Sequence, residues 1–220
     1  SSSGSGLKTN LTSIDRILVA DDFSEFSLRA VQSALVLARR HGAELHHVHV
    51  AEKAKDEESA LSSESEIKRQ LASTLRSASD ALGLDDVDDP TSEIEIHHVV
   101  LRGRAPGPAM LKYVYENKID LVVAGTHGRT GLRRLILGSV AEELVHHAPC
   151  PVLTLRDRPL KSDIKRLLVP VDFSEDSAKA LSLARVISEK TGSEIDLLHV
   201  IEDLPTPSFF GDEVGSIYDL

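Results

Sequence analysis

The stretch "GTHGRTGLRRLILGS" contains the residues of this sequence whose types and spacing most clearly suggest a chemical role. Glycine loses more conformational freedom on folding than any other residue, so Gly125, Gly128 and Gly138 need a reason. The first two glycines would let the backbone approach a ligand closely, and Gly138 with Ser139 would begin a helix. Because free N–H groups at a helix start attract phosphate, and Arg129 adds positive charge, the pattern predicts an anion site.

The elements that must position this loop alternate regularly along the chain. Short apolar runs of the kind found in parallel strands buried on both faces occur at Arg16–Ala20, Glu44–Val50, Ser92–Leu101, Asp120–Gly125 and Pro151–Leu155. Helical patterns separate them: one from Ser24 to Gly42, one over Glu57–Leu82, one that begins near Pro106 or Pro108, and one over Val140–His147. Strands that alternate with helices predict an α/β fold with an open, parallel, five-stranded sheet.

A crevice beyond the carboxyl ends of the strands is where such sheets bind ligands. The glycine-rich loop follows the fourth strand, and Asp22 follows the first strand in "ADDFSE". If the first and fourth strands are neighbours, the carboxylate of Asp22 faces the loop across one crevice.

An internal repeat divides the chain into two units. The 35 residues from Arg16 align without a gap with the 35 residues from Arg166, and 15 of these 35 positions are identical. We therefore expect a flexible leader (1–13), a complete first unit (14–156), a linker (157–162) and a partial second unit (163–220). The second unit would contain two strands and a helix, without a copy of the glycine-rich loop.

The pattern Gly-x2-Gly-x9-Gly-Ser after a first strand that ends in "DDFSE" resembles the universal stress protein family. The resemblance implies a flavodoxin-like, Rossmann-like sheet of order 3-2-1-4-5 that binds ATP in some members. It places the residue matched by Asp22 at the adenosine, Val50 beside adenine, and the glycine-rich loop at the ribose and phosphates. With Arg129 from the reasoning above, the predicted nucleotide-binding residues are Ala20, Asp21, Asp22, Val50, Ala124, Gly125, His127, Gly128, Arg129, Gly138, Ser139 and Val140.

Asp21 departs from the family pattern, which has an uncharged residue before the aspartate. A second carboxylate near phosphates would repel them unless a divalent cation such as Mg²⁺ intervened. The second unit has Val171 at the matching position. We therefore expect ATP as the cofactor, with Mg²⁺ as a possible companion.

Catalytic motifs are absent from the sequence. It has no Gly-x4-Gly-Lys-Ser/Thr loop, no Gly-x-Gly-x-x-Gly fingerprint after the first strand and no Gly-x-Ser-x-Gly elbow. We therefore predict a nucleotide-responsive stress or regulatory protein with at most slow ATP hydrolysis. The alternative is an interaction module of the same fold that binds no nucleotide.

Several candidate residues also have simpler interpretations. The glycines could serve packing and helix ends alone, Asp22 could cap a helix, and His127 could be a surface residue. His47 and His49 share one strand face, as a metal pair would, while His97 and His98 point to opposite faces. No cysteine or carboxylate cluster accompanies these four histidines in the sequence. We interpret these histidines as sheet or rim residues. Arg133 and Arg134 are interpreted as solvated helix charges.

Composition and charge exclude other classes of protein. A net charge of -10 disfavours a general nucleic-acid surface, and no apolar run approaches the ~20 residues of a membrane span. Cys150 is the one cysteine, which fits a reducing compartment, so we expect a cytoplasmic location. The apolar strand Pro151–Leu155 should lie at the sheet edge, and in the family this strand commonly pairs across a two-fold axis. We therefore predict a homodimer through it.

Overall fold

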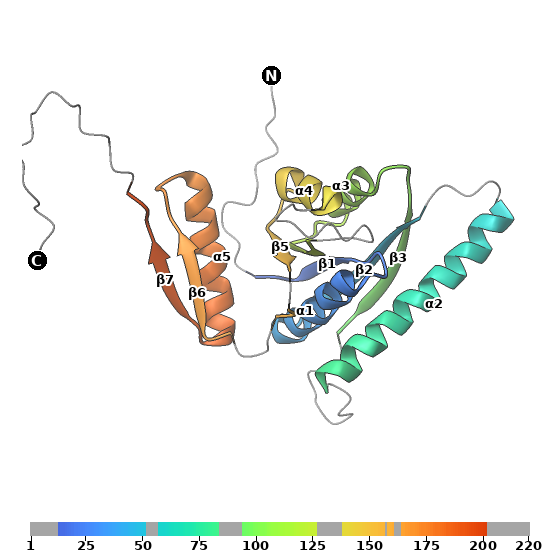
Figure 1. Ribbon diagram of the computed structural model, residues 1–220, viewed down its shortest axis with the longest axis horizontal. Helices are drawn as coiled ribbons and strands as arrows, with labels where there is room; N and C mark the ends of the chain where they lie inside the picture. The colour runs from blue at the N-terminus through green and yellow to red at the C-terminus, as the bar shows by residue number, and fades with distance from the viewer. Residues whose placement is uncertain are drawn as a thin grey trace, which may run out of the picture.

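The first unit folds around a single parallel sheet. The structure is a computed structural model that describes residues 13–51, 57–83, 94–126, 138–156, 158–160 and 164–201. The strands are β1 (Arg16–Ala20), β2 (Glu44–Ala51), β3 (Ile96–Arg102), β4 (Leu121–Gly125) and β5 (Val152–Leu155). They lie in the order β3-β2-β1-β4-β5 (Figure 1). The predicted α/β fold and its strand order are therefore confirmed.

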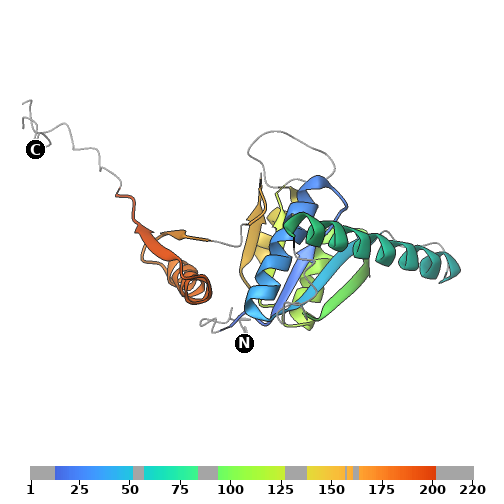
Figure 2. The same ribbon diagram turned by 90° about the horizontal axis from the view of Figure 1, so that it is seen from below.

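Helices cover both faces of this sheet, as Figures 1 and 2 show. They are α1 (Glu25–His41), α2 (Glu57–Leu82), α3 (Pro106–Glu116) and α4 (Ser139–His147). Ala34 of α1 and Ala78 of α2 join the buried cluster on one face. Val114 of α3 and Leu144 of α4 join the cluster on the other face, where they meet Leu18 of β1. Since both faces are buried, β4 and the middle of β1 are apolar without alternation, whereas β2 and β3 also carry histidines.

The ends of α1 follow the predicted signals. The Ser24 side chain accepts a hydrogen bond from the backbone N–H of Ser27, and Gly42 ends the helix at φ 66°. A helix leaves the N–H groups of its first turn and the carbonyl groups of its last turn without internal partners. Ser24 pairs with one of these N–H groups, and the Gly42 N–H donates to the carbonyl of Ala38. The second unit repeats them, with Ser174 as the N-cap and Gly192 at φ 69°.

Three strands begin later than the sequence predicts, and for β5 the difference is one residue, from Pro151 to Val152. β3 starts at Ile96 rather than at Ser92, which lies outside the described residues. β4 starts at Leu121, directly after Asp120, whose carboxylate accepts hydrogen bonds from the backbone N–H groups of Asp15 and Arg16. The Asp120 carboxylate thus links the start of β4 to the start of β1, the neighbouring strand in the sheet.

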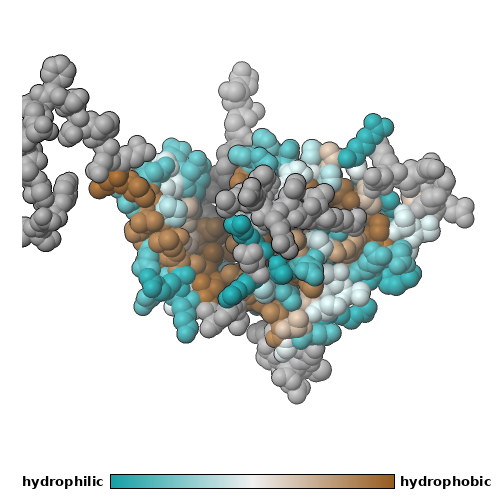
Figure 3. Space-filling model, in the orientation of Figure 1, coloured by the Kyte–Doolittle hydropathy of each residue, from teal (hydrophilic) through white to brown (hydrophobic). Residues whose placement is uncertain are grey.

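The described part of the second unit consists of β6 (Arg166–Pro170), α5 (Glu175–Thr191) and β7 (Glu194–Leu198). β6 and β7 pair in parallel. Val186 of α5 is buried in the same cluster as α1 and α2. The small sheet remains open, since Leu168 is 64% exposed and Leu197 is 58% exposed. Hydrophobic residues accordingly gather on the surface over β6 and β7 in Figure 3.

None of the helices in the described residues combines the length and the apolar character that a bilayer crossing requires.

Candidate functional site

A cavity of about 590 Å³ lies beyond the carboxyl ends of β1, β2, β3 and β4. This volume is ordinary for a small-molecule site. Nine of the predicted residues line it: Ala20, Asp21, Asp22, Val50, Ala124, Gly125, Gly138, Ser139 and Val140. We call this cavity the crevice. His127, Gly128 and Arg129, together with Arg133 and Arg134, lie outside the described residues.

The start of α4 is tied to the end of β4. The backbone N–H of Gly138 donates to the carbonyl of Thr126 at 2.7 Å, and the Thr126 N–H donates to the Leu155 carbonyl. Gly138 is the N-cap of α4 and offers no side-chain hydrogen bond to the helix. The first N–H groups of α4 are thus left without a capping side chain at the crevice wall, where they favour an anion.

A second helix start lies in the same wall, and the sequence analysis predicted this helix but not its place at the crevice. α3 begins at Pro106 with no side-chain cap, and Gly103, Arg104 and Pro106 all line the crevice. Arg104 is exposed and adds a positive charge. The signal was present in "GRAPGP", because a glycine and prolines that follow a strand mark a tight strand-to-helix turn.

Asp22 and Phe23 form a sharp turn between β1 and α1. The carboxylate of Asp22 accepts the Ser24 N–H at 3.1 Å, so it stabilises the turn while Ser24 caps the helix. Phe23 has φ 64° and stacks on His49, with ring centroids 4.5 Å apart. His49 in turn bonds through Nδ1 to the Asp21 carbonyl oxygen at 2.7 Å. The turn at the floor of the crevice is therefore stabilised by hydrogen bonds between side chains and backbone groups.

The Asp21 side chain is enclosed and has no exposed surface. Its carboxylate bonds to His47 Nε2 at 2.9 Å and accepts hydrogen bonds from the Ser27 hydroxyl and the Phe23 N–H, each at 2.7 Å. Burial alone would raise the pKa of Asp21, but these hydrogen bonds lower the pKa below its usual 3.8. The carboxylate is thus satisfied within the protein and offers no free oxygen to phosphate or to a cation.

Ser27, Asp21 and His47 are the residue types of a hydrolase triad, but their hydrogen bonds connect them in a different order. In a triad the histidine contacts the serine hydroxyl and takes its proton. Here the aspartate lies in the middle, and the serine hydroxyl donates to Asp21 and to the Ser24 carbonyl. The contact needed to activate a nucleophile is missing from this trio, whose role is structural.

His47 and His49 both contact Asp21. Each ring uses one nitrogen in the contacts to Asp21 described above. Their interpretation as sheet and rim residues fits this geometry.

Gly125 has a packing role that differs from the predicted approach to a ligand. A Cβ at this position would lie 2.9 Å from the carbonyl oxygen of Phe26 and 3.0 Å from its carbonyl carbon. The absence of a side chain therefore lets the end of β4 lie directly against the first turn of α1.

Comparisons with known proteins agree with this architecture. The model of the universal stress protein family matches residues 13–156 and 163–215. A universal stress protein of Thermus aquaticus is 36% identical over 140 residues, which are 64% of this chain and 97% of the relative. Universal stress protein MJ0531 of Methanocaldococcus jannaschii is 32% identical over 143 residues, 64% of this chain and 81% of the relative.

A solved universal stress protein from Archaeoglobus fulgidus shares the fold. It has a TM-score of 0.64 at 21% identity, over 86% of this chain and 68% of the other. The fold, the repeat and the match of the family model to most of the sequence lead to one conclusion: this chain belongs to the universal stress protein family.

Proposed function

We propose that the crevice of the first unit binds an adenine nucleotide, with ATP as the natural ligand, and that binding serves regulation rather than catalysis. One observation carries the proposal: nine predicted nucleotide positions line a single cavity together with two helix starts that lack capping side chains. Val50, Met110 and Val140 provide apolar surface for a base. The start of α4 provides N–H donors and Arg104 provides positive charge for phosphates, whereas α3, whose Pro106 and Pro108 lack an N–H, adds its helix dipole.

Mg²⁺ would reach this site with the phosphates rather than through Asp21. The Asp21 carboxylate is enclosed by His47, Ser27 and the Phe23 N–H and leaves no oxygen free. Asp22 is the remaining predicted carboxylate that lines the crevice. Mg²⁺ itself favours phosphate oxygens and water, with one or two carboxylates. Cation dependence should therefore be modest and follow the phosphates.

Calorimetric titration with ATP, with and without Mg²⁺, tests the proposal. We expect a micromolar Kd, which corresponds to about −8 kcal/mol. Binding of adenosine should be weaker, because it lacks the phosphates that the helix starts attract. Absence of heat and of a thermal shift at millimolar ATP would contradict the proposal and favour the interaction-module alternative.

Ser139→Asp should separate binding from stability. Ser139 is exposed in the first turn of α4 and lines the crevice. A carboxylate at a helix start interacts favourably with the helix dipole, so the melting temperature should be unchanged or slightly higher. The same charge repels phosphate, so ATP affinity should fall about 10-fold or more. Ser139→Ala is the control and should cost about 1 kcal/mol of binding. Equal ATP affinity in Ser139→Asp and the parent would place the phosphates elsewhere.

We propose in addition that the protein forms a homodimer through β5. β5 lies at the end of the strand order and contacts β4 on one side. Thr126 donates to the Leu155 carbonyl, and Val122 donates to the Pro151 carbonyl. Since backbone groups alternate in direction along a strand, those of Val152 and Thr154 face the outer edge. Exposed donors and acceptors at such an edge favour pairing with the same strand of a second chain.

Thr154→Pro should therefore convert a dimer to a monomer. Proline removes the outward N–H of residue 154 and leaves the hydrogen bonds between β5 and β4 in place. Thr154→Ala is the matched control, because it shortens the same side chain and keeps the N–H. Light scattering should give a dimer for the parent and for Thr154→Ala, and a monomer for Thr154→Pro. A monomeric parent, or a dimeric proline variant, would count against the β5 interface.

A further inference from the structure

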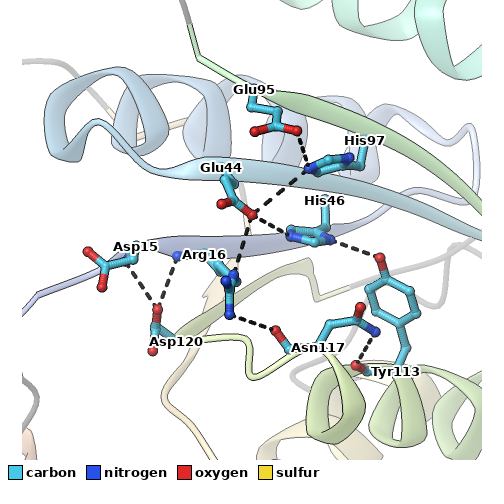
Figure 4. A network of polar contacts seen from close by, with 9 residues as sticks. All are labelled: Asp15, Arg16, Glu44, His46, Glu95, His97, Tyr113, Asn117 and Asp120. Atoms are coloured by element: carbon cyan, nitrogen blue, oxygen red, sulfur yellow. Dashed lines mark hydrogen bonds and ion pairs between the residues drawn. The ribbon is translucent and has the colours of Figure 1, made fainter.

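Two equivalent segments lie side by side at the amino ends of β2 and β3, at the sheet edge opposite the crevice. Residues 44–47 read Glu-Leu-His-His, and residues 95–98 read Glu-Ile-His-His. The two strands pair so that His46 lies beside His97. Since alternate residues of a strand share a face, the glutamate and the first histidine of each segment point to the same side. Figure 4 shows these four side chains converging.

The contacts among these side chains are close to those of a metal site. Ligand atoms of Glu44, His46 and His97 all lie within 4.8 Å of one another. The carboxylate of Glu44 is 3.6 Å from Nε2 of His46 and 3.9 Å from Nε2 of His97. Glu95 lies 3.3 Å from the same nitrogen of His97. Ligands at 2.0–2.2 Å around a tetrahedral ion are about 3.3 Å apart, so a small contraction would complete the geometry.

An unsatisfied nitrogen provides independent evidence for a ligand. His46 is only 6% exposed, and its Nε2 has no hydrogen-bond partner among the described residues. Buried polar atoms are normally paired, so a lone nitrogen that faces the Glu44 carboxylate at 3.6 Å needs an explanation. Nδ1 of the same ring lies 2.8 Å from the Tyr113 hydroxyl. When this Nδ1–H donates to Tyr113, Nε2 carries the lone pair that a metal requires.

The second unit provides an internal comparison. Its residue at the position of His46 is Asp196, which pairs with Arg166 at hydrogen-bond distance. Arg16, the counterpart of Arg166, instead contacts the carboxylate of Glu44 at 3.3 Å. In the second unit Arg166 therefore pairs with the residue at the histidine position. In the first unit Arg16 pairs with Glu44 instead, and Nε2 of His46 has no hydrogen-bond partner among the described residues.

We propose that Glu44, His46 and His97 bind a divalent transition-metal ion of the Zn²⁺ class, with Glu95 or water as the fourth ligand. Two imidazoles and a carboxylate suit Zn²⁺, while Mg²⁺ prefers oxygen ligands alone. Arg16 and Lys118 line the surrounding cavity and oppose a cation, whereas Glu44, Glu95 and Glu116 favour it. This site is independent of the nucleotide crevice.

Equilibrium dialysis of the metal-free 220-residue chain against Zn²⁺, without nucleotide, tests the proposal. We expect one tightly bound Zn²⁺ per chain that excess Mg²⁺ does not displace. His97→Ala and Glu44→Gln should each weaken binding at least 10-fold, and Tyr113→Phe, which keeps the ring packed on His46, should weaken it about 10-fold. Co²⁺ in place of Zn²⁺ should give visible absorption bands that His97→Ala abolishes.

The matched control is His98→Ala. His98 is the next residue of β3 and contacts His47 on the opposite face of the sheet, so its loss should leave Zn²⁺ affinity unchanged. Because His97 and Glu44 are partly exposed, their variants should keep the parental circular dichroism spectrum. Binding that survives both His97→Ala and Glu44→Gln, binding that instead depends on the exposed pair His146 and His147, or no binding at all would overturn the proposal.

Discussion

Asp21→Val should destabilise the protein by about 3–5 kcal/mol, because it removes one partner of a fully buried polar pair. Asp21 and His47 are joined at 2.9 Å, and neither side chain has exposed surface. The variant would leave Nε2 of His47 without its acceptor and the Phe23 N–H without its own. His47→Leu should be similarly costly, since it leaves a buried carboxylate with fewer donors. Urea denaturation followed by circular dichroism measures both changes.

The double variant Asp21→Val/His47→Leu should recover most of this loss. The second unit has the same apolar residue types at the two matching positions, with Val171 at the position of Asp21 and Leu197 at the position of His47. Replacing a buried polar pair by apolar residues of similar volume is often neutral or stabilising. Ser27 keeps a partner in the Ser24 carbonyl, as Ser177 does with Ser174. We expect a coupling energy of about 3 kcal/mol in the double-mutant cycle. Additive losses would show that the two side chains act separately.

The dependence of stability on acidic pH provides a second measure of the interaction between Asp21 and His47. Hydrogen bonds hold the pKa of Asp21 in the folded protein below the usual value of 3.8. A carboxyl group with a lowered folded pKa contributes stability above the unfolded pKa and loses it as the pH falls through the folded pKa. The parent should therefore lose stability below about pH 3.8 more steeply than the double variant. Urea midpoints of the two proteins at several acidic pH values test this difference, and parallel curves would exclude Asp21 as a cause.

Features that depend on one segment at a time could be predicted from the sequence. The apolar runs and the helical patterns between them predicted strands and helices that the structure contains. Ser24 and Gly42 predicted the ends of α1 because capping is a local property. The crevice could be placed as well, since carboxyl ends of parallel strands share one edge of the sheet.

Features that depend on the register between strands could not be predicted in the same way. Asp21 was expected near phosphate, but its enclosure depends on His47 facing it from β2. The convergence of His46 and His97 requires that β2 and β3 pair with their Glu-x-His segments level. A shift of one residue would move each histidine to the other face. The shared pattern Glu-Leu/Ile-His-His in adjacent strands was a usable signal for this register.

Gly125→Ala should destabilise the protein by about 3 kcal/mol through steric conflict. Its added methyl would meet the backbone carbonyl of Phe26 at 2.9 Å, and backbone atoms cannot move aside as the end of a side chain can. Gly103→Ala is the matched control, because Gly103 lies directly after β3, Gly125 is the last residue of β4, and both line the crevice. There the nearest atom is the Ala109 side chain at 3.3 Å, so the cost should be below about 1 kcal/mol.

Urea denaturation of the two glycine variants, paired with ATP titration, decides why β4 ends in glycine. A packing role predicts a lower urea midpoint for Gly125→Ala, together with weaker ATP binding, because the end of β4 must move away from α1. A role in ligand approach predicts the parental midpoint with ATP binding alone reduced. Since the Cβ of residue 125 would point at Phe26, we expect the first result, and an unchanged midpoint would show that the contact with α1 tolerates a side chain.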